Sequence, residues 1–598
     1  MKKTILSVAM ILAALSLYSQ DKRLAGLDSF INRVLKEWHA AGVGIAVVEK
    51  NKVILAKGYG FRDIDKKYPV NDSTLFAIGS CTKAFTSSLL GILANEGKLD
   101  LDKPVYTFMP ELQFVNTSLS DNITTRDMMS HRTGLPRHDM AWYGAPSRRD
   151  SLLYRIRFFE NSANLREKWQ YNNFMFLAQG CLAEKLSGKK WEELVSEKIF
   201  LPLGMNNSSP YISVMEKGTN AAVGYEVKKD SLITRMNYLN IDAVGPAGSI
   251  NSSPKEMAKW VITWINGGKY NGKEILPSSY VNQAISSQMV INAGLPSPEN
   301  QDVHFANYGL AWSLASYRGH FRVEHGGNID GFSANTSFYP SDSIGIVVLV
   351  NQNGSPLPTI IRNTISDKML GLSSRNWNQF SKNTVAKNKE AAKLKKSADS
   401  ADRKIGTKPS HAMTDYAGVY KNPGYGNIVV TRTGDSLAMR YNRLSARLRH
   451  YHYDIFNVIP LDDITGEPEN DGAQKMTFGM NVKGDIENLS IQFEAAVKPI
   501  VFTKEIEALN LKKADLEKYT GEYNLPGAAI KVYVKGENTL MMLVPGQPDY
   551  ELVPVKTHEF NIKSLSGYSV KFDVDEKNIV TAANLVQPNG IFKAPKKN

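Results

Sequence analysis

The chain has 598 residues, of which 42% are hydrophobic and 22% charged, and this ordinary balance excludes global disorder. A single compact domain usually has roughly 100–200 residues, so we expect one large domain and at least one companion. The formal net charge is +13, but much of the excess lies in a Lys-rich segment at residues 382–408. A nucleic-acid-binding surface needs a basic stripe with interleaved aromatic residues, so this segment indicates a solvated linker helix and no nucleic-acid partner.

The first twenty residues have the pattern of a secretory signal peptide. Two lysines precede an apolar run at residues 5–17, and small and polar residues follow before Asp21. The run is shorter than the about 20 apolar residues that a membrane-spanning helix needs. We therefore expect residues 1–20 to be removed, and the mature protein to be periplasmic or secreted without stable membrane insertion.

The sequence has two cysteines, Cys81 and Cys181. An exported protein could join them in a disulfide. Both fall in segments that are predicted to be buried helix, where a small core residue is the simpler interpretation. No Cys/His cluster has the spacing of a metal site, so we expect neither a metal nor a cofactor.

Residues 22–372 predict a mixed α/β domain in which helices flank an antiparallel sheet. Residues 76–99 predict a long helix with one apolar face, which Gly97 ends as a C-cap glycine would. Two pairs of strands are predicted near the ends of the domain, at residues 43–53 with 54–60 and at residues 334–339 with 344–351.

After a polar segment at residues 373–410, which predicts a charged helical linker, the sequence becomes rich in short strands and repeats itself. Tyr416-Ala-Gly-Val-Tyr420 recurs as Tyr519-Thr-Gly-Glu-Tyr523. Later pieces recur at the same offset of about a hundred residues, which is typical of a duplicated module. We therefore expect two tandem all-β modules, at residues 411–505 and 512–598, each a small barrel or a sandwich.

The first of three chemical motifs in the large domain is Ser80-Cys-Thr-Lys83. Residues three apart share a helix face, so the Lys83 amine can reach the Ser80 hydroxyl. A serine is a poor nucleophile without a base, and a lysine can be that base if burial lowers its pKa. Taken alone, the motif fits equally well an N-capping serine beside a solvent-facing lysine.

The second motif is Tyr171-Asn-Asn173, directly before a predicted helix. The tyrosine hydroxyl could relay a proton to a leaving group, and the Asn173 amide could hold Lys83 and bind a substrate carbonyl. On its own, the motif also fits an ordinary loop.

The third motif is His325-Gly326-Gly327. Its glycine pair allows a strand edge to approach a ligand closely. The N–H of Asn328, just beyond the pair, could join the N–H of Ser80 as an oxyanion hole. A histidine beside two glycines is also common in turns.

In this order the three motifs resemble those of the serine β-lactamase and penicillin-binding-protein superfamily, in its class C-like branch. The resemblance extends over about residues 25–370 and includes three further segments: Leu99-Asp-Leu-Asp-Lys-Pro104, Met129-Ser-His-Arg-Thr-Gly-Leu135 and Pro246-Ala-Gly-Ser-Ile250. It implies an α+β transpeptidase-like fold without a required metal.

The resemblance also implies roles for the motif residues. Ser80 is the nucleophile, Lys83 and Tyr171 share general-base and general-acid work, and Asn173 orients the substrate amide. His325, Gly326 and Gly327 lie on an edge strand against which the substrate docks. The amides of Ser80 and Asn328 hold the oxyanion.

His325 is the departure that narrows the activity. β-Lactamases of this branch carry lysine there, whereas a histidine is largely neutral at pH 7. Relatives with His-x-Gly resemble D-aminopeptidases, D-residue-specific peptidases and esterases more than efficient β-lactamases. The β modules resemble the lipocalin-like domain that follows the catalytic domain in some of these peptidases, where it narrows the active-site entrance or helps form oligomers.

The sequence thus predicts an exported serine peptidase or amidase that acts on short peptides, including peptides with D-residues. An esterase or weak β-lactamase is the first alternative, and a catalytically silent binding protein of the cell envelope is the second. The expected partner is a small peptide or ester substrate, and assembly into a homo-oligomer stays open.

Overall fold

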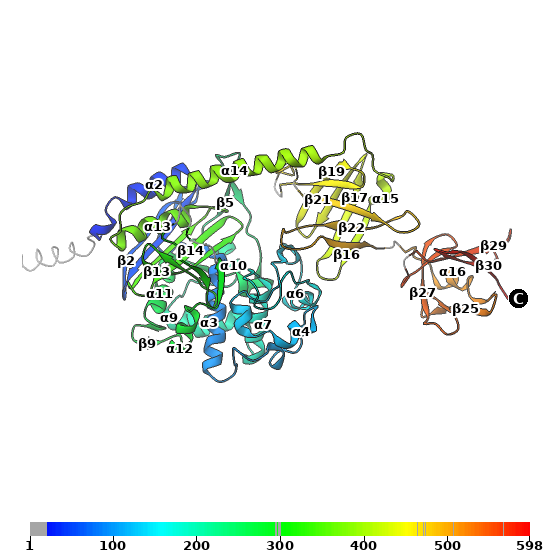
Figure 1. Cartoon of the computed structure of the whole chain (residues 1–598), viewed down its shortest axis with the longest axis horizontal. Helices are drawn as coiled ribbons and strands as arrows, with labels where there is room; N and C mark the ends of the chain where they lie inside the picture. Colours follow the sequence, from blue (N-terminus) through cyan, green and yellow to red (C-terminus); the bar gives the residue numbers. More distant parts are fainter. Residues whose placement is uncertain are drawn as a thin grey trace, which may run out of the picture. The chain divides into compact units, whose positions relative to one another are not determined.

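The computed structural model describes residues 21–292, 296, 301–462, 465–470, 472, 474–505, 508–565 and 567–597. The signal peptide predicted at residues 1–20 lies outside these ranges, so its removal stays a prediction. The described part of the chain forms two compact units, divided between Ser397 and Ala398, whose helices and strands are drawn in Figure 1. In the described parts, no helix has both the length and the apolar content that a membrane span would require.

The first unit is built on a nine-stranded sheet. Its pairings are all antiparallel. The order is β10 (Met289–Asn292), β11 (Ala306–Tyr308), β12 (Ser313–Tyr317), β13 (His320–Ile329), β14 (Phe332–Tyr339), β15 (Ile344–Val350), β1 (Gly42–Glu49), β2 (Lys52–Asp63) and β3 (Tyr68–Pro69). Both predicted strand pairs are present. They are adjacent in the sheet because β1 pairs with β15, with Val43 opposite Val350.

Helices cover both faces of the central strands, which explains their continuous apolar sequences. On one face, β1 and β15 pack with α2 (Leu27–Glu37) and α13 (Leu357–Met369) in a single hydrophobic cluster. On the other face lies α11 (Pro254–Ile265), and its Val261 sits against Gly345. Strands buried on both faces lose the polar alternation of a half-exposed strand. The predicted antiparallel sheet flanked by helices is confirmed.

The helix predicted over residues 76–99 begins later than its apolar pattern indicated. Its first residues form β4 (Phe76–Ala77), which pairs with β7 (Asn251–Ser252). A short 3-10 turn, η2 (Gly79–Cys81), then leads into α3 (Thr82–Asn95). The prediction was wrong here because a pairing with residues far along the chain decides the conformation. The C-terminal end is as predicted, with Gly97 at φ 75° just after the helix.

The second unit holds two β modules. The first is a closed barrel of β16 (Gly418–Asn422), β17 (Gly426–Thr433), β18 (Ser436–Tyr441), β19 (Leu444–His452), β20 (Ile455–Pro460), β21 (Gln474–Met480), β22 (Ile486–Ile491) and β23 (Ile500–Lys504). The second is an eight-stranded sheet of β24 (Gly521–Leu525), β25 (Ala528–Lys535), β26 (Thr539–Leu543), β27 (Tyr550–Lys556), β28 (Glu559–Ile562), β29 (Ser569–Val574), β30 (Val580–Gln587) and β31 (Gly590–Pro595).

The two modules differ in closure. In the first, β16 pairs with β23. In the second, a single bridge between Tyr523 and Lys596 brings the ends together, so this barrel is nearly closed. The predicted all-β modules are confirmed, and of the two open alternatives the barrel is the one found. The segment before them forms α14 (Trp377–Asp402).

The repeated tyrosine motif makes the same bond in both modules. The Tyr420 hydroxyl donates to the Tyr416 carbonyl oxygen at 2.7 Å, and the Tyr523 hydroxyl donates to the Tyr519 carbonyl oxygen at 2.7 Å. All four tyrosines are buried. A buried hydroxyl needs a partner, so this bond accounts for the second tyrosine of each copy, whereas the first supplies only its backbone carbonyl oxygen.

Candidate active site

The first motif brings a buried amine against a serine hydroxyl. Ser80 lies in η2 and Lys83 in the first turn of α3, with Lys83 Nζ 3.0 Å from Ser80 Oγ. The Lys83 side chain is completely buried. Its Nζ also donates to Asn173 Oδ1 at 2.7 Å and to the Ala247 carbonyl oxygen at 2.7 Å. The first and second motifs therefore meet at one nitrogen.

The surroundings of Lys83 favour its uncharged form. Burial, followed by the positive charge of Arg137, holds the pKa of Lys83 well below its ordinary value. The oxygens bonded to Nζ belong to a hydroxyl, an amide and a backbone carbonyl, and none is a carboxylate. A neutral amine has two hydrogens, which the amide and carbonyl oxygens accept. Its lone pair then faces Ser80 Oγ, as a general base requires.

Asn173 is held by a carboxylate that the sequence analysis missed. It precedes α7 (Phe174–Ser187), and its Nδ2 donates to Asp139 Oδ1 at 2.8 Å. This bond fixes the amide so that Oδ1 faces Lys83. The same carboxylate accepts from Arg137 Nε at 2.6 Å and from Trp142 Nε1 at 2.8 Å. In the sequence, Arg137 and Asp139 carry opposite charges just after Gly-Leu-Pro136. This pair of charges could have identified Asp139 as a candidate site residue.

Tyr171 lies in the loop before α7, and its ring contacts the groups of the first motif. The centroid of the ring is 4.8 Å from Lys83 Nζ and 4.8 Å from Arg137 Cζ. Burial raises the pKa of Tyr171, and a hydrogen bond with Ser80 acts in the opposite direction. The hydroxyl is therefore protonated at neutral pH and close to Ser80, where it can donate a proton.

His325 lies on β13, which is an inner strand of the sheet between β12 and β14 and not the predicted edge strand. The pairing with β12 ends at Glu324, whereas residues 325–329 still pair with β14. Both ring nitrogens of His325 are engaged inside the protein. Nδ1 is 2.6 Å from the Gly326 carbonyl oxygen, and Nε2 is 2.9 Å from the hydroxyl of Tyr308 on β11. Burial, followed by the charge of Lys83, lowers the pKa of His325 to about 3. The side chain is thus uncharged at neutral pH. Tyr308 was not found from the sequence because a lone tyrosine on a short strand is unremarkable there.

A second buried histidine, His131, stands beside the site. Its ring centroid is 4.3 Å from that of Tyr171 and 5.0 Å from that of Tyr308. Its Nδ1 accepts a hydrogen bond from the backbone N–H of Asn172 at 3.1 Å. Burial, then the nearby charge of Lys83, holds the pKa of His131 well below its ordinary value. Both histidines are therefore neutral neighbours of the Ser80 and Lys83 pair.

Backbone packing puts the third motif against Ser80. A Cβ atom on Gly327 would lie 1.9 Å from the Ile78 carbonyl oxygen and 3.2 Å from the Ser80 backbone nitrogen. A Cβ atom on Gly79, whose φ is 52°, would lie 2.8 Å from the Asn328 backbone nitrogen. Only glycine fits at these two positions. The amides of Ser80 and Asn328, predicted to form an oxyanion hole, therefore belong to backbone segments in direct contact.

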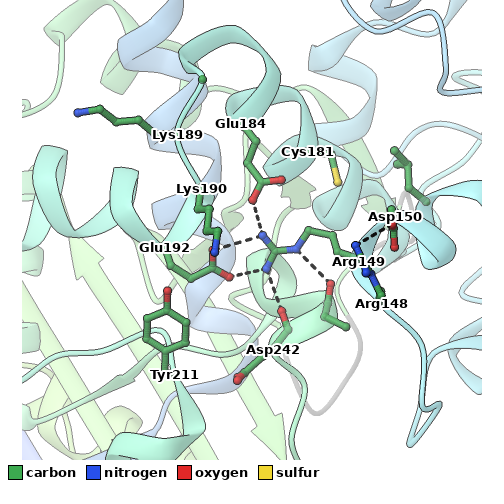
Figure 2. A pocket seen from close by; sticks show the side chains of 13 residues that line it. Arg148, Arg149, Asp150, Cys181, Glu184, Lys189, Lys190, Glu192, Tyr211 and Asp242 are labelled. Atoms are coloured by element: carbon green, nitrogen blue, oxygen red, sulfur yellow. Dashed lines mark hydrogen bonds and ion pairs between the residues drawn. The ribbon is translucent and has the colours of Figure 1, made fainter.

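A separate network fixes the segment that supplies the Ala247 carbonyl. This segment is η7 (Asp242–Ala247). Arg149 donates to Glu184 Oε1 and Glu192 Oε1, both at 2.5 Å, and to the carbonyl oxygen of Asp242 at 2.8 Å. Figure 2 shows this guanidinium between the two carboxylates, in a pocket of about 660 Å³. The Ser80 site does not line that pocket.

The cysteines take no part in this chemistry. Both are free. Cys81 is buried, and its thiol donates to the His325 carbonyl oxygen at 3.2 Å. Burial raises the pKa of the Cys81 thiol to about 11 and that of the Cys181 thiol to about 12. Within the described ranges, no group of three or more His, Cys, Asp and Glu side chains is arranged to hold a metal ion.

Two family models match parts of this chain. The family model for β-lactamase matches residues 27–366, and that for a domain of unknown function (DUF3471) matches residues 402–504. The unguisins hydrolase ungD' of Aspergillus campestris is 30% identical over 426 residues, which cover 67% of this chain and 76% of that protein. Protein flp of Staphylococcus aureus is 25% identical over 339 residues, which cover 56% of this chain and 64% of that protein.

A solved structure shares the fold. The octameric penicillin-binding protein homologue from Pyrococcus abyssi superposes with a TM-score of 0.52 at 21% identity, over 80% of this chain and 100% of that one. The resemblance stated from the three motifs is confirmed, because the family model covers more than half of the sequence. The chain belongs to the β-lactamase family of hydrolases, within the superfamily of serine β-lactamases and penicillin-binding proteins.

Proposed function

We propose that this protein is an exported serine hydrolase that cleaves short peptides through an acyl-enzyme on Ser80. The observation that supports this most strongly is the environment of Lys83. A completely buried amine, bonded to three uncharged oxygens, stands 3.0 Å from a serine hydroxyl. An ammonium group would be poorly stabilised there, whereas a neutral amine is a base of suitable strength.

The proposed reaction has two halves. In acylation, Ser80 Oγ attacks the scissile carbonyl while its proton moves to Lys83, and the amides of Ser80 and Asn328 stabilise the oxyanion. The proton then passes through the Tyr171 hydroxyl to the leaving amine as the C–N bond breaks. In deacylation, water attacks the ester, the same groups handle its proton, and Ser80 is regenerated. Asn173 holds Lys83 and binds the substrate amide.

The uncharged His325 supports a peptide or ester as the acyl donor in preference to a β-lactam. A fixed positive charge at the third motif would favour the carboxylate that β-lactams carry, and here both ring nitrogens are engaged inside the protein. A relative that is named as a hydrolase of unguisins supports hydrolytic activity in this branch of the family. Preference for D-residues follows from the resemblance of His-x-Gly members to D-aminopeptidases.

A fluorophosphonate probe tests the nucleophile directly. We expect stoichiometric labelling of the wild type at Ser80, located by peptide mass spectrometry. Labelling should be lost in Ser80→Ala and kept in Ser118→Ala, which changes an exposed serine outside the site. A folded wild type that the probe does not label would refute the proposal.

A substrate panel separates the proposed activity from its alternative, an esterase or weak β-lactamase. Wild type and Ser80→Ala are compared on D- and L-aminoacyl nitroanilides, p-nitrophenyl esters and nitrocefin. We expect turnover of the nitroanilides that depends on Ser80. Turnover of esters or nitrocefin alone would favour the alternative. Export is tested by expressing the whole chain and sequencing the mature N-terminus, which we expect near residue 21.

A further inference from the structure

His131 holds the backbone on both sides of Tyr171. The backbone N–H of Gln170, the residue before Tyr171, donates to the His131 carbonyl oxygen at 2.8 Å. The backbone N–H of Asn172, the residue after it, donates to His131 Nδ1 at 3.1 Å. Between these two bonds, the centroid of the imidazole ring lies 4.3 Å from that of the Tyr171 ring. One residue from a distant part of the sequence therefore contacts the ring of the tyrosine and both of its backbone neighbours.

The bond from Asn172 defines the tautomer of His131. A backbone N–H can only donate, so Nδ1 is the acceptor, and the hydrogen of the neutral ring is on Nε2. A protonated ring would carry a hydrogen on Nδ1 as well, and this bond would be lost. Burial, followed by the charge of Lys83, holds the pKa of His131 well below its ordinary value. The acceptor is therefore available at neutral pH.

Position 131 is a costly place for a histidine. Its φ is 55°, in the left-handed region that glycine and asparagine adopt more easily, and the side chain is completely buried. The ring also packs against Phe176 and Tyr308, which a phenylalanine ring would do equally well. Nε2 has no hydrogen-bond partner among the described residues. The polar interaction that the imidazole adds is the bond at Nδ1, which holds the loop of Tyr171.

We propose that His131 positions Tyr171 as the proton donor to the leaving group. In the proton step, Tyr171 gives its hydroxyl proton to the leaving atom as the bond to the acyl carbon breaks, and it receives the proton that Lys83 took from Ser80. This inference rests on the proposed function, because that step belongs to the proposed acylation. His131 is a positioning residue that acts through Tyr171, and it exchanges no proton itself.

The test compares two esters with the same acyl group, an ethyl ester and a p-nitrophenyl ester. Ethoxide needs a proton in order to leave, whereas p-nitrophenolate leaves without one. Misplacing the proton donor therefore slows the ethyl ester selectively. The measured quantity is the ratio of kcat/KM for the ethyl ester over the p-nitrophenyl ester, followed by pH-stat titration of the released acid. Deacylation does not enter kcat/KM, and the test does not require that peptides are cleaved.

Two amide variants separate the acceptor from the rest of the ring. Only the shorter side chain of His131→Asn can place its oxygen where Nδ1 lies, and asparagine tolerates the left-handed backbone. In His131→Gln we expect the ratio to fall by about ten-fold or more, as in Tyr171→Phe, and in His131→Asn to stay within about three-fold of the wild type. A general loss of structure would slow both esters alike and leave the ratio unchanged.

His138→Gln is the matched control. His138 is another buried histidine in the left-handed region, with φ 51°, and its Nε2 lies 3.1 Å from the Glu160 carbonyl oxygen. This variant should keep the wild-type ratio. If His131→Gln does not fold, His131→Gly replaces it, because glycine fits the backbone and has no acceptor.

The inference is overturned if the folded variant without the acceptor keeps the wild-type ratio. It is also overturned if His131→Asn loses the ratio to the same extent, because the acceptor at Nδ1 would then not be what positions Tyr171. A wild type that fluorophosphonate does not label at Ser80 would instead mark failure of the proposed function.

Discussion

Lys83 and Asp127 are both completely buried in the first unit, but their neighbours differ in charge. Asp127 accepts from Arg132 Nε at 2.6 Å, from Arg166 Nη2 at 2.8 Å and from the backbone N–H of Thr124 at 3.0 Å. Burial raises the pKa of Asp127, but the bonds from the two arginines outweigh it, and the pKa lies below its ordinary value. Lys83 meets only uncharged oxygens.

These surroundings indicate different roles, because the charge of Asp127 stabilises the structure whereas the neutral amine of Lys83 is suited to act as a base. Asp127 lies in α5 (Thr125–Met129), and its ion pairs with Arg132 and Arg166 compensate its negative charge. These pairs also anchor the loop that continues to His131. The bonds that Lys83 makes go to uncharged oxygens, and the Asp139 carboxylate acts on it only from farther away, so its neutral form costs less to bury. A buried ionisable group without a partner of opposite charge is a candidate for proton transfer, whereas a fully paired one is a candidate for stability.

The largest expected effect is that of Lys83→Met on activity. Without the base, kcat/KM for a peptide substrate should fall by about a thousand-fold or more. The free energy of unfolding should rise, by about 1–2 kcal/mol, because an apolar side chain replaces a buried amine. Stopped enzyme assays and urea unfolding measure the two. Lys185→Met, at an exposed ion pair with Glu111, is the control and should change neither much. If Lys83→Met were less stable than the wild type but still active, Lys83 would have a structural role and not a catalytic one.

Asp127→Asn should show the opposite pattern. Removing the carboxylate leaves Arg132 and Arg166 without their anion, so the free energy of unfolding should fall by about 3 kcal/mol. Because the pKa of Asp127 is lowered in the fold, its stabilisation is present above the unfolded-state pKa and is lost as the pH falls through the folded value. Urea unfolding from pH 7 to pH 2 should show this acid-dependent part in the wild type and not in the variant.

Asp150→Asn is the control for that measurement, since its carboxylate is exposed, pairs with exposed Arg148 and accepts from the adjacent backbone N–H of Ser151. Its unfolding curve should match the wild type. If Asp127→Asn is as stable as the wild type, the ion pairs of Asp127 with the two arginines do not stabilise the fold. Asp127 would then not be an example of a structural charge to set against Lys83.

The smallest expected effect is that of Arg137→Gln. The guanidinium is half exposed, and its charge lowers the pKa of Lys83. Removing it raises that pKa, so the acid limb of kcat/KM, where Lys83 becomes neutral, should move to higher pH. At pH 7 the loss should be less than about five-fold, because exposed charges are screened. The pH profile of kcat/KM at low and high salt measures this shift, with Arg148→Gln as the control. If the acid limb stays at the same pH, burial alone lowers the pKa of Lys83.

Local spacing made part of the site predictable from the sequence. Ser80 and Lys83 are three residues apart, and a helical turn brings such residues together wherever the helix lies. The resemblance then supplied Tyr171, Asn173 and His325. The β modules were predictable because the tyrosine motif recurs, and each copy makes its own short-range bond.

Asp139 and Tyr308 could not be predicted in the same way. Each acts through a hydrogen bond to a residue distant in the sequence, Asn173 for one and His325 for the other. The start of α3 was misplaced for a related reason, because β4 is fixed by pairing with β7. Patterns of hydrophobicity do not contain such pairings. Where residues 1–20 are cut is likewise a prediction from the sequence.

The close backbone contact at Ser80 defines which positions of η2 and β13 a protein engineer can vary. Gly79 and Gly327 have no room for a side chain, so saturation libraries there would yield mostly inactive or unfolded variants. Gly326 lies between His325 and Gly327, and a Cβ atom on it would meet only the Ala334 carbonyl oxygen, at 3.8 Å. Gly326 can therefore be mutated in a search for new substrate selectivity, whereas Gly79 and Gly327 must stay glycine.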